Sequence, residues 1–139
     1  MDFVSFDIAK TLKTKRFDVP VYASIRLIYS DRPDTKITVF SDPENFNEIP
    51  EEENYYCTYS CPLYQTVIDW LNSVHNIHIG IYPVSVKQYN GIDIVCYQSD
   101  IYRIDEKEHT LVIYNKKEHD SRKDAVKYVV EYCINNLIS

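Results

Sequence analysis

Four residues between positions 57 and 78 have side chains that bind zinc in many proteins. Cys57, Cys61, His75 and His78 follow the spacing Cys-x3-Cys-x13-His-x2-His, which is close to that of a nucleic-acid-binding zinc finger. A zinc ion needs each ligand atom within about 2.0–2.3 Å. Residues 62–75 predict a helix, which would be roughly 21 Å long at about 1.5 Å per residue. Cys61 and His75 would then lie at opposite ends of one helix, so we expect no metal site.

The other reactive residue types form no catalytic arrangement. Cys61 at a helix N-terminus would have a lowered thiol pKa, but the sequence places no histidine or second thiol beside it. We therefore interpret Cys61 as a small buried side chain. The chain has two glycines, Gly80 and Gly91, and they stand alone, so neither a phosphate-binding loop nor a dinucleotide fingerprint is present. The sequence predicts no catalytic residue and no cofactor, and hence a protein that is not an enzyme.

Length and composition predict one folded domain over residues 1–139. The hydrophobic content is 45%, which supports a packed core, and the net charge is -6 with a pI of about 5.1. An acidic chain gains no general attraction to nucleic acid or to an anionic membrane. The start, MDFVSFDIAK, is no secretory signal, and no apolar run approaches the roughly 18 residues of a membrane span. Four dispersed cysteines indicate reduced thiols, and we expect a cytoplasmic protein without a membrane partner.

The N-terminal half predicts a helix followed by a hairpin. Ser5 is a suitable N-cap, and apolar residues then recur at helical spacing over residues 6–15. Residues 21–30 and 36–40 are rich in β-branched and aromatic side chains, and the turn between them indicates a hairpin. The stretch SDPENFNEIPEEEN, residues 41–54, is acidic and has no periodicity, so we expect it to form a surface loop.

The C-terminal half predicts the order helix, strand, strand, strand, helix. Apolar residues at three- and four-residue intervals mark the helix over 62–75, and Asn76 is suited to a left-handed end. Asp120 or Ser121 then caps a last helix with a wide apolar face. The strands between the two helices are expected at residues 77–83, 92–104 and 109–115. Together with the N-terminal half, this order predicts an α+β fold: a mainly antiparallel sheet of about five strands with two or three helices on one face.

Tyrosine is the most unusual feature of the composition, with thirteen residues. Four of them gather where the acidic loop meets the central helix, off the apolar stripe of that helix: Tyr55, Tyr56, Tyr59 and Tyr64. Tyrosine is enriched in recognition surfaces, so we expect at least two of these rings to be exposed and adjacent in a protein interface. The alternative is that the rings cover the sheet edge or the end of the helix.

Three segments carry a resemblance to known proteins: SFDIAKTLKTKRFD, LYQTVIDWLNSVHNIHIGIYP and SRKDAVKYVVEYCINNLI. They resemble a group of small uncharacterised proteins encoded by phages, prophages and mobile elements of Bacteroidales gut bacteria. The resemblance covers most of the chain and is weakest over residues 35–59. This sequence departs from the group at Arg16, where glycine is usual, and in the RKDAV opening of the last helix. The resemblance implies a setting rather than an activity: an accessory protein of phage or mobile-element origin in a bacterial cytoplasm.

Two functional hypotheses follow. The first is a non-enzymatic protein-interaction module that binds a host or phage protein, or a second copy of itself. The alternative is a nucleic-acid-binding protein, because helix-strand-strand-strand-helix is also the order of the double-stranded-RNA-binding domain. The basic residues that would contact phosphates gather around the start of the last helix: Lys116, Lys117, Arg122, Lys123 and Lys127. Topological order alone is weak support for a function.

Overall fold

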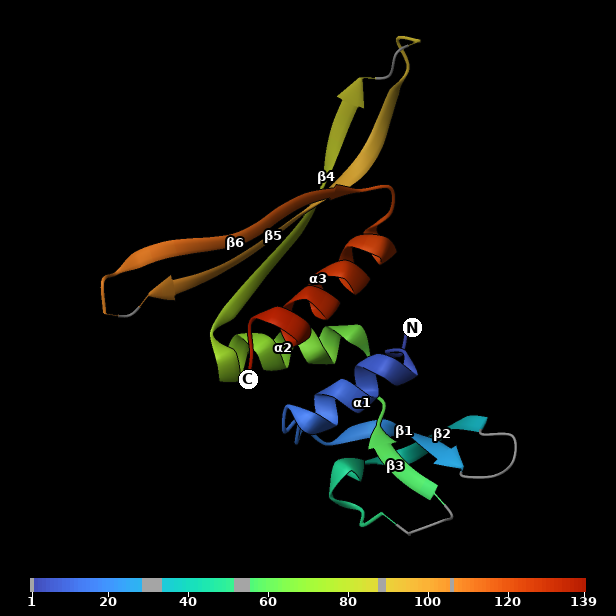
Figure 1. Ribbon diagram of the computed structural model, residues 1–139. Helices are drawn as coiled ribbons and strands as arrows, with labels where there is room; N and C mark the ends of the chain where they lie inside the picture. Colours follow the sequence, from blue (N-terminus) through green and yellow to red (C-terminus); the bar gives the residue numbers. More distant parts are fainter. Residues whose placement is uncertain (1, 29–33, 52–55, 88–89, 106) are drawn as a thin grey trace. The chain divides into compact units, whose positions relative to one another are not determined.

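The structure is a computed structural model that describes residues 2–28, 34–51, 56–87, 90–105 and 107–139 (Figure 1). The described residues cluster into two compact units, with the boundary between Thr66 and Val67, and residues 138–139 belong to the first unit. A single domain over 1–139 stays a prediction. The elements, in chain order, are α1 (Phe6–Thr14), β1 (Val21–Ile28), β2 (Asp34–Glu44), the 3-10 helix η1 (Phe46–Glu48), β3 (Tyr56–Ser60), α2 (Tyr64–His75), β4 (Ile77–Lys87), β5 (Asp93–Asp105), β6 (Thr110–His119) and α3 (Arg122–Asn136).

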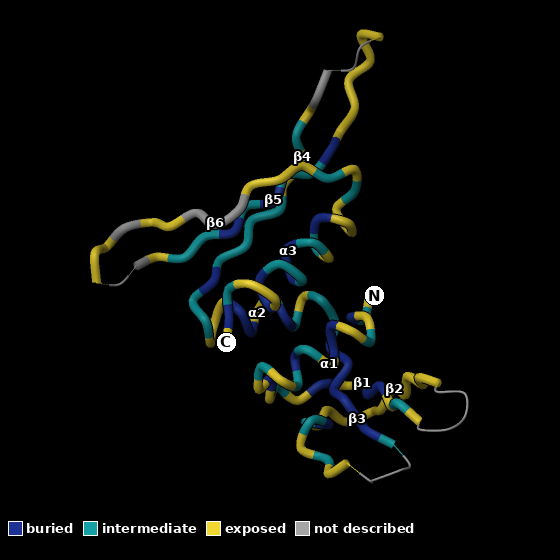
Figure 2. The backbone as a smooth tube through the Cα atoms, viewed as in Figure 1, coloured by how far each residue is buried: buried dark blue, intermediate teal, exposed yellow. Residues whose placement is uncertain are grey.

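The first unit is a three-stranded antiparallel sheet in the order β2-β1-β3, with α1 against one face (Figure 2). Side chains of β1 alternate between the two faces, and Ala23 and Ile25 are buried on the face that meets α1. The ring of Tyr59, opposite Ile25 in register, packs edge-on against Phe6 of α1. The predicted apolar stripe of α1 is confirmed, because Ile8, Ala9 and Leu12 are its buried residues.

Both ends of α1 are closed by local hydrogen bonds. The hydroxyl of Ser5 accepts from the Ile8 amide at 3.4 Å, which confirms the predicted N-cap. At the other end Arg16 has a positive φ of 63°. The amide of Phe17 donates to the Leu12 carbonyl, and both side chains are buried. This is the pattern of a helix that ends in a left-handed residue followed by an apolar contact, a position that normally favours glycine.

The second unit contains a three-stranded antiparallel sheet in the order β4-β5-β6, together with α3 and the part of α2 from Val67 onward. The predicted order of helix, three strands and helix is confirmed. Asn76 ends α2 with a φ of 55°, and the hydroxyl of Ser121 accepts from the Asp124 amide at the start of α3; both were predicted. Val126 is half-buried, whereas the central apolar residues of α3 are buried: Ala125, Val129, Val130, Cys133 and Ile134.

Three structural expectations need correction. The strands form two sheets rather than one sheet of about five, because β3 pairs back onto β1 and β4 pairs with β5. The expected loop over 41–54 begins as strand, since β2 continues to Glu44, and Phe46 of η1 is buried; residues 52–54 lie outside the described part.

The central helix begins at Tyr64 rather than at residue 62. The Cys61 amide donates to the Ala23 carbonyl and the Pro62 carbonyl accepts from the Val4 amide, so both residues are held extended.

The end of α1 yields a first prediction. Replacing Arg16 with glycine should raise the free energy of unfolding by about 0.5–1 kcal/mol, because relief of the left-handed strain exceeds the entropy that glycine adds to the unfolded chain. Chemical denaturation measures the change. The control Lys10→Gly, at an exposed position inside α1, should lower the same quantity by about 1 kcal/mol. A destabilised Arg16→Gly variant would contradict this account of the helix end.

The core of α3 yields a second prediction. Val129 is fully buried, so Val129→Asp should abolish cooperative unfolding or lower the melting temperature strongly, because an unpaired carboxylate is costly in an apolar interior. The matched control is Lys127→Asp, two residues earlier on the exposed side of the same helix, which should melt close to wild type. A near-native melt of Val129→Asp would show that α3 does not pack as described.

Candidate functional site

The residues with zinc-finger spacing take structural positions. Among the residues that the structure describes, no group of three or more His, Cys, Asp or Glu side chains could hold a metal ion. Cys57 and Cys61 are buried thiols without a disulfide. His75 is the last residue of α2, and His78 lies in β4, where its ring stacks on Tyr102 with centroids 5.3 Å apart. The predicted helix up to His75 and the strand beyond it are thus confirmed.

Cys61 is a buried packing residue rather than a reactive thiol. Its side chain is fully buried, and Sγ lies 3.6 Å from the carbonyl oxygen of Val4. Burial raises the pKa of this thiol to about 11, so the thiolate is scarce at neutral pH. Burial likewise raises the pKa of the Cys133 thiol in α3 to about 12. The interpretation of Cys61 as a small buried side chain is confirmed, although it stands outside the helix.

The prediction that at least two of the four tyrosines are exposed and adjacent is wrong for the three that the structure describes. Tyr59 is buried, and Tyr56 and Tyr64 are half-buried; Tyr55 lies outside the described residues. Two contacts explain why. Tyr59 faces α1, where its ring meets Phe6 and lies 5.0 Å from the ammonium of Lys13. The ring of Tyr56 lies 4.2 Å from the guanidinium of Arg26.

This arrangement arises because residues 56–60 form β3, a strand that is not among the predicted elements. The alternation of a strand sends Tyr59 toward the helix and the neighbouring residues toward the other face. The short run YCTYS, with aromatic and β-branched residues ahead of a Cys-Pro pair, is the signal that indicates it. A role of these tyrosines in a protein interface stays untested and loses the exposure on which it rested.

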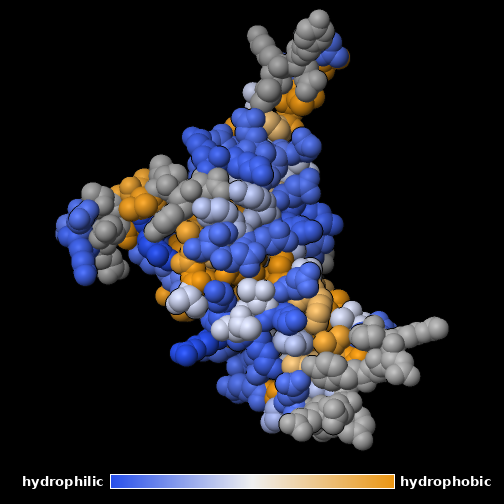
Figure 3. Space-filling view, in the orientation of Figure 1, coloured by the Kyte–Doolittle hydropathy of each residue, from blue (hydrophilic) through white to orange (hydrophobic). Residues whose placement is uncertain are grey.

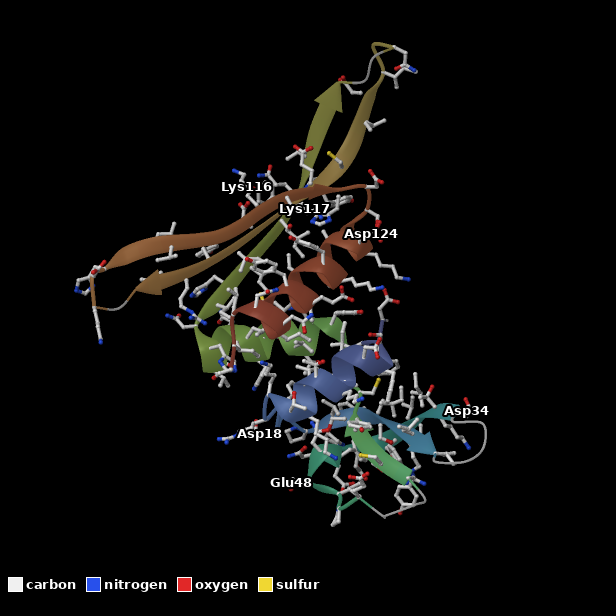
Figure 4. All side chains as sticks on the ribbon, viewed as in Figure 1. Asp18, Asp34, Glu48, Lys116, Lys117 and Asp124 are labelled. Carbon is white, nitrogen blue, oxygen red and sulfur yellow. The ribbon has the colours of Figure 1, made fainter. Side chains whose placement is uncertain are left out.

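The predicted basic patch is exposed but is interrupted by acidic residues. All five side chains are exposed: Lys116, Lys117, Arg122, Lys123 and Lys127. Lys117 and Asp124 lie near each other between β6 and α3, while Lys116 stands opposite Asp100 of β5 (Figure 4). The ammonium of Lys117 lies 4.3 Å from the ring centroid of Tyr128. The structure therefore exposes all five cations and places acidic residues beside two of them.

The surroundings of two histidines of the second unit lower their pKa. Burial lowers the pKa of His75, and the positive charge of Arg103 lowers it further. Burial, followed by the charge of Lys117, lowers the pKa of His119, against the opposing effects of Asp124 and Asp120. Nε2 of His119 lies 2.9 Å from the hydroxyl oxygen of Ser99. A charged His75 at the helix end, which would complement the helix dipole, is thus disfavoured.

Exposed apolar side chains concentrate on the strands. Among the described residues, the exposed large hydrophobic side chains outside strands are Val74 and Ile92; the others lie on β1, β2, β4, β5 and β6. Scattered apolar residues are ordinary on protein surfaces, but contiguous apolar area on strands marks interaction sites. In the first unit, Ile37 and Val39 on the edge strand β2 are opposite the buried Ile25 and Ala23 and are themselves exposed.

One end of the β4–β5 hairpin is uncovered. β5 pairs with β4 as far as Lys87↔Asp93, whereas its pairing with β6 starts only at Tyr97↔His119. Residues 84–87 and 93–96 therefore form a two-stranded ribbon, here called the β4–β5 ribbon (Figure 1). Ile94 and Val95 point to opposite faces of the ribbon, and 42% and 60% of their surfaces are exposed. Apolar groups are thus uncovered on both faces of the ribbon.

At its other end, β5 pairs with β6 alone, over a shorter two-stranded segment. Ile104 and Leu111 face each other across β5 and β6, and both are exposed. Val112 beside them is exposed as well. Figure 3 shows apolar surface toward the ends of both hairpins. The sequence indicated the strands but not their exposed ends, because the offset between neighbouring strands depends on register rather than on local pattern.

Comparisons with protein-family models, curated proteins and solved structures found no match to this chain. Among the described residues, no helix is both long enough and apolar enough to cross a bilayer.

The two histidines yield a prediction about pH. A lowered pKa in the folded state means that the unfolded chain binds more protons once the pH falls through about 6.5. Stability is therefore complete above that pH and decreases as the pH falls below it. His75→Gln, which cannot take up a proton, should reduce the drop in melting temperature between about pH 7.5 and pH 5.5. His119→Gln should do the same.

The control is His109→Asn, at an exposed position with a positive φ of 54° that asparagine tolerates. It should leave the pH dependence of the melting temperature at the wild-type value. Equal slopes for all four proteins would show that neither half-buried histidine contributes to the acid sensitivity.

Proposed function

We propose that this chain is a non-enzymatic accessory protein that binds another protein through the β4–β5 ribbon. The observation that carries the proposal is the exposure of Ile94 and Val95 on opposite faces of a two-stranded ribbon. A two-stranded hairpin is marginally stable in water without further cover. A partner that encloses both faces removes this apolar surface from water. Because each side chain is about half-exposed in the free chain, each then contributes about half of the roughly 1.5–3 kcal/mol that full burial gives.

The partner that fits is a protein with an apolar groove, in which the ribbon lies as an inserted arm. The ribbon also has open backbone edges, since β6 does not reach residues 93–96. An extended segment of the partner can add its own backbone hydrogen bonds to such an edge. The resemblance to phage and mobile-element proteins supports a host or phage protein as this partner, in the cytoplasm of the carrying bacterium. No described residue cluster supports an enzymatic role.

Photo-crosslinking tests the proposal. A photoreactive amino acid at position 95 should crosslink one host or phage protein in element-carrying cells, and the same probe at the exposed position 10 of α1 should not. Affinity for the purified partner is then measured. Ile94→Thr combined with Val95→Thr, which keeps β-branched side chains in the strand, should weaken binding by about tenfold or more.

The matched control is Leu111→Thr, which removes a comparably exposed apolar side chain from β6. It should retain wild-type affinity, and all three proteins should have similar melting temperatures because the substituted residues are exposed. A crosslink at position 95 to a second copy of this chain only, or an unchanged affinity of the double variant, would contradict the proposal.

The nucleic-acid alternative is supported by the confirmed order of α2, β4, β5, β6 and α3 and by the five exposed basic residues. Glu118, Asp120 and Asp124 lie among these cations and offset their attraction for phosphate. We therefore expect no mobility shift of duplex RNA at micromolar protein and low salt. A shift that weakens with salt and disappears in Lys123→Gln combined with Lys127→Gln would favour the alternative.

A further inference from the structure

The open face of the first unit's sheet carries a groove that the interaction proposal does not use. The groove has a volume of about 310 Å³ and lies over β1 and β2. Its lining is mixed, with two cations, two hydroxyls and two apolar side chains: Ser24, Arg26, Ile28, Lys36, Thr38 and Phe40. These residues lie on the face away from Ile25 and α1, because side chains alternate along each strand.

Two positive charges stand directly opposite each other in this groove. Arg26 and Lys36 are register partners on β1 and β2, and both are exposed. Like charges at such positions destabilise a sheet. Among the described residues, neither cation forms an ion pair. Asp34, a carboxylate on the same face, lies opposite Ile28 and accepts from the Thr35 amide. The fold thus keeps a repulsive pair that no described side chain neutralises.

The guanidinium of Arg26 is held in place by an aromatic ring. It lies 4.2 Å from the ring centroid of Tyr56, which stands opposite Ile28 on β3. Contact with the ring face leaves the N–H groups at the edge of the guanidinium available for an oxyanion. Phe40 at the other side of the groove is fixed by stacking on Phe46, with centroids 5.0 Å apart.

Two buried hydroxyls on the same face are without hydrogen-bond partners. Thr58 and Ser60 stand opposite Arg26 and Ser24 in register, and they are 2% and 0% exposed. Oγ1 of Thr58 and Oγ of Ser60 make no hydrogen bond to the described residues. A buried hydroxyl without a partner is costly. Both oxygen atoms are buried and do not line the groove, so they are not contacts for a ligand there. The feature of this face that an oxyanion would satisfy is the unbalanced positive charge of Arg26 and Lys36.

We propose that the groove binds a small phosphate monoester, a molecule of about the size of a mononucleotide. Arg26 and Lys36 contact the phosphate, the hydroxyls of Ser24 and Thr38 donate to its oxygens, and Phe40 and Ile28 flank the organic group. The volume stands at the lower end of the range for small-molecule sites, about 300–1,000 Å³. Two cations match a dianion, and a charge-assisted contact to each is stronger than a neutral hydrogen bond.

An NMR titration of the full chain with adenosine 5′-monophosphate tests the proposal. Saturable shifts are expected for the amides of β1 and β2 at millimolar ligand and physiological salt. Adenosine without phosphate should cause no such shifts, and inorganic phosphate should cause them with lower affinity. Arg26→Gln combined with Lys36→Gln should weaken binding by about tenfold or more, whereas Lys10→Gln on α1 should leave it unchanged.

A second readout separates ligand binding from a structural role. Lys36→Gln removes the repulsion, so the unliganded variant should melt at a higher temperature than wild type while it binds the monophosphate more weakly. No saturable shift at millimolar ligand, or equal affinity of the double variant and wild type, would overturn the proposal. Shifts produced by single-stranded RNA but not by the monophosphate would overturn it too, in favour of a nucleic-acid surface.

Discussion

The offset pairing of β5 is the constraint on which the second unit depends. β5 spans Asp93–Asp105 and is the central strand, but β4 and β6 cover different parts of its length. Only the overlap has strands on both sides, and the buried Ser99 and Ile101 lie within it. Toward each end β5 has one partner, and the apolar side chains there are exposed. The same register that builds the centre of the sheet thus leaves apolar side chains exposed toward both ends of β5.

The two proposed surfaces differ in the interaction that would supply their binding energy. The β4–β5 ribbon offers apolar area with open strand edges, so its contribution comes mainly from removing side chains such as Val95 from water. The groove on the first unit offers an unbalanced pair of cations, Arg26 and Lys36, and its contribution is electrostatic. Salt should therefore weaken ligand binding in the groove and have little effect on the ribbon.

Local sequence signals predicted much of the fold. Ser5 and Ser121 as N-caps, Asn76 as a left-handed helix end and the apolar faces of α1 and α3 each depend on residues within a few positions of one another. These features are confirmed because capping and helical periodicity are decided locally. The expectation that Cys61 and His75 cannot share a zinc ion rested on a helix between them, and α2 is present at Tyr64–His75.

Non-local pairing determined what the sequence could not predict. Whether β3 joins β1 or a C-terminal strand depends on contacts between distant residues, so one sheet was expected where two exist. Tyr59 is a core residue because it lies in β3, which was not predicted. Its position beside an acidic loop had suggested exposure. The opposition of Arg26 and Lys36 follows from the β1–β2 register and has no local sequence signal.

Hydrogen–deuterium exchange on the chain with its crosslinked partner tests the central claim most directly. In the isolated chain, amides of residues 84–87 and 93–96 should exchange faster than those at the centre of β5, because the ribbon lacks cover. Addition of the partner should slow exchange in the ribbon and leave the start of α3 unchanged. Protection confined to α3 or to the first unit, with the ribbon still exchanging fast, would contradict the account.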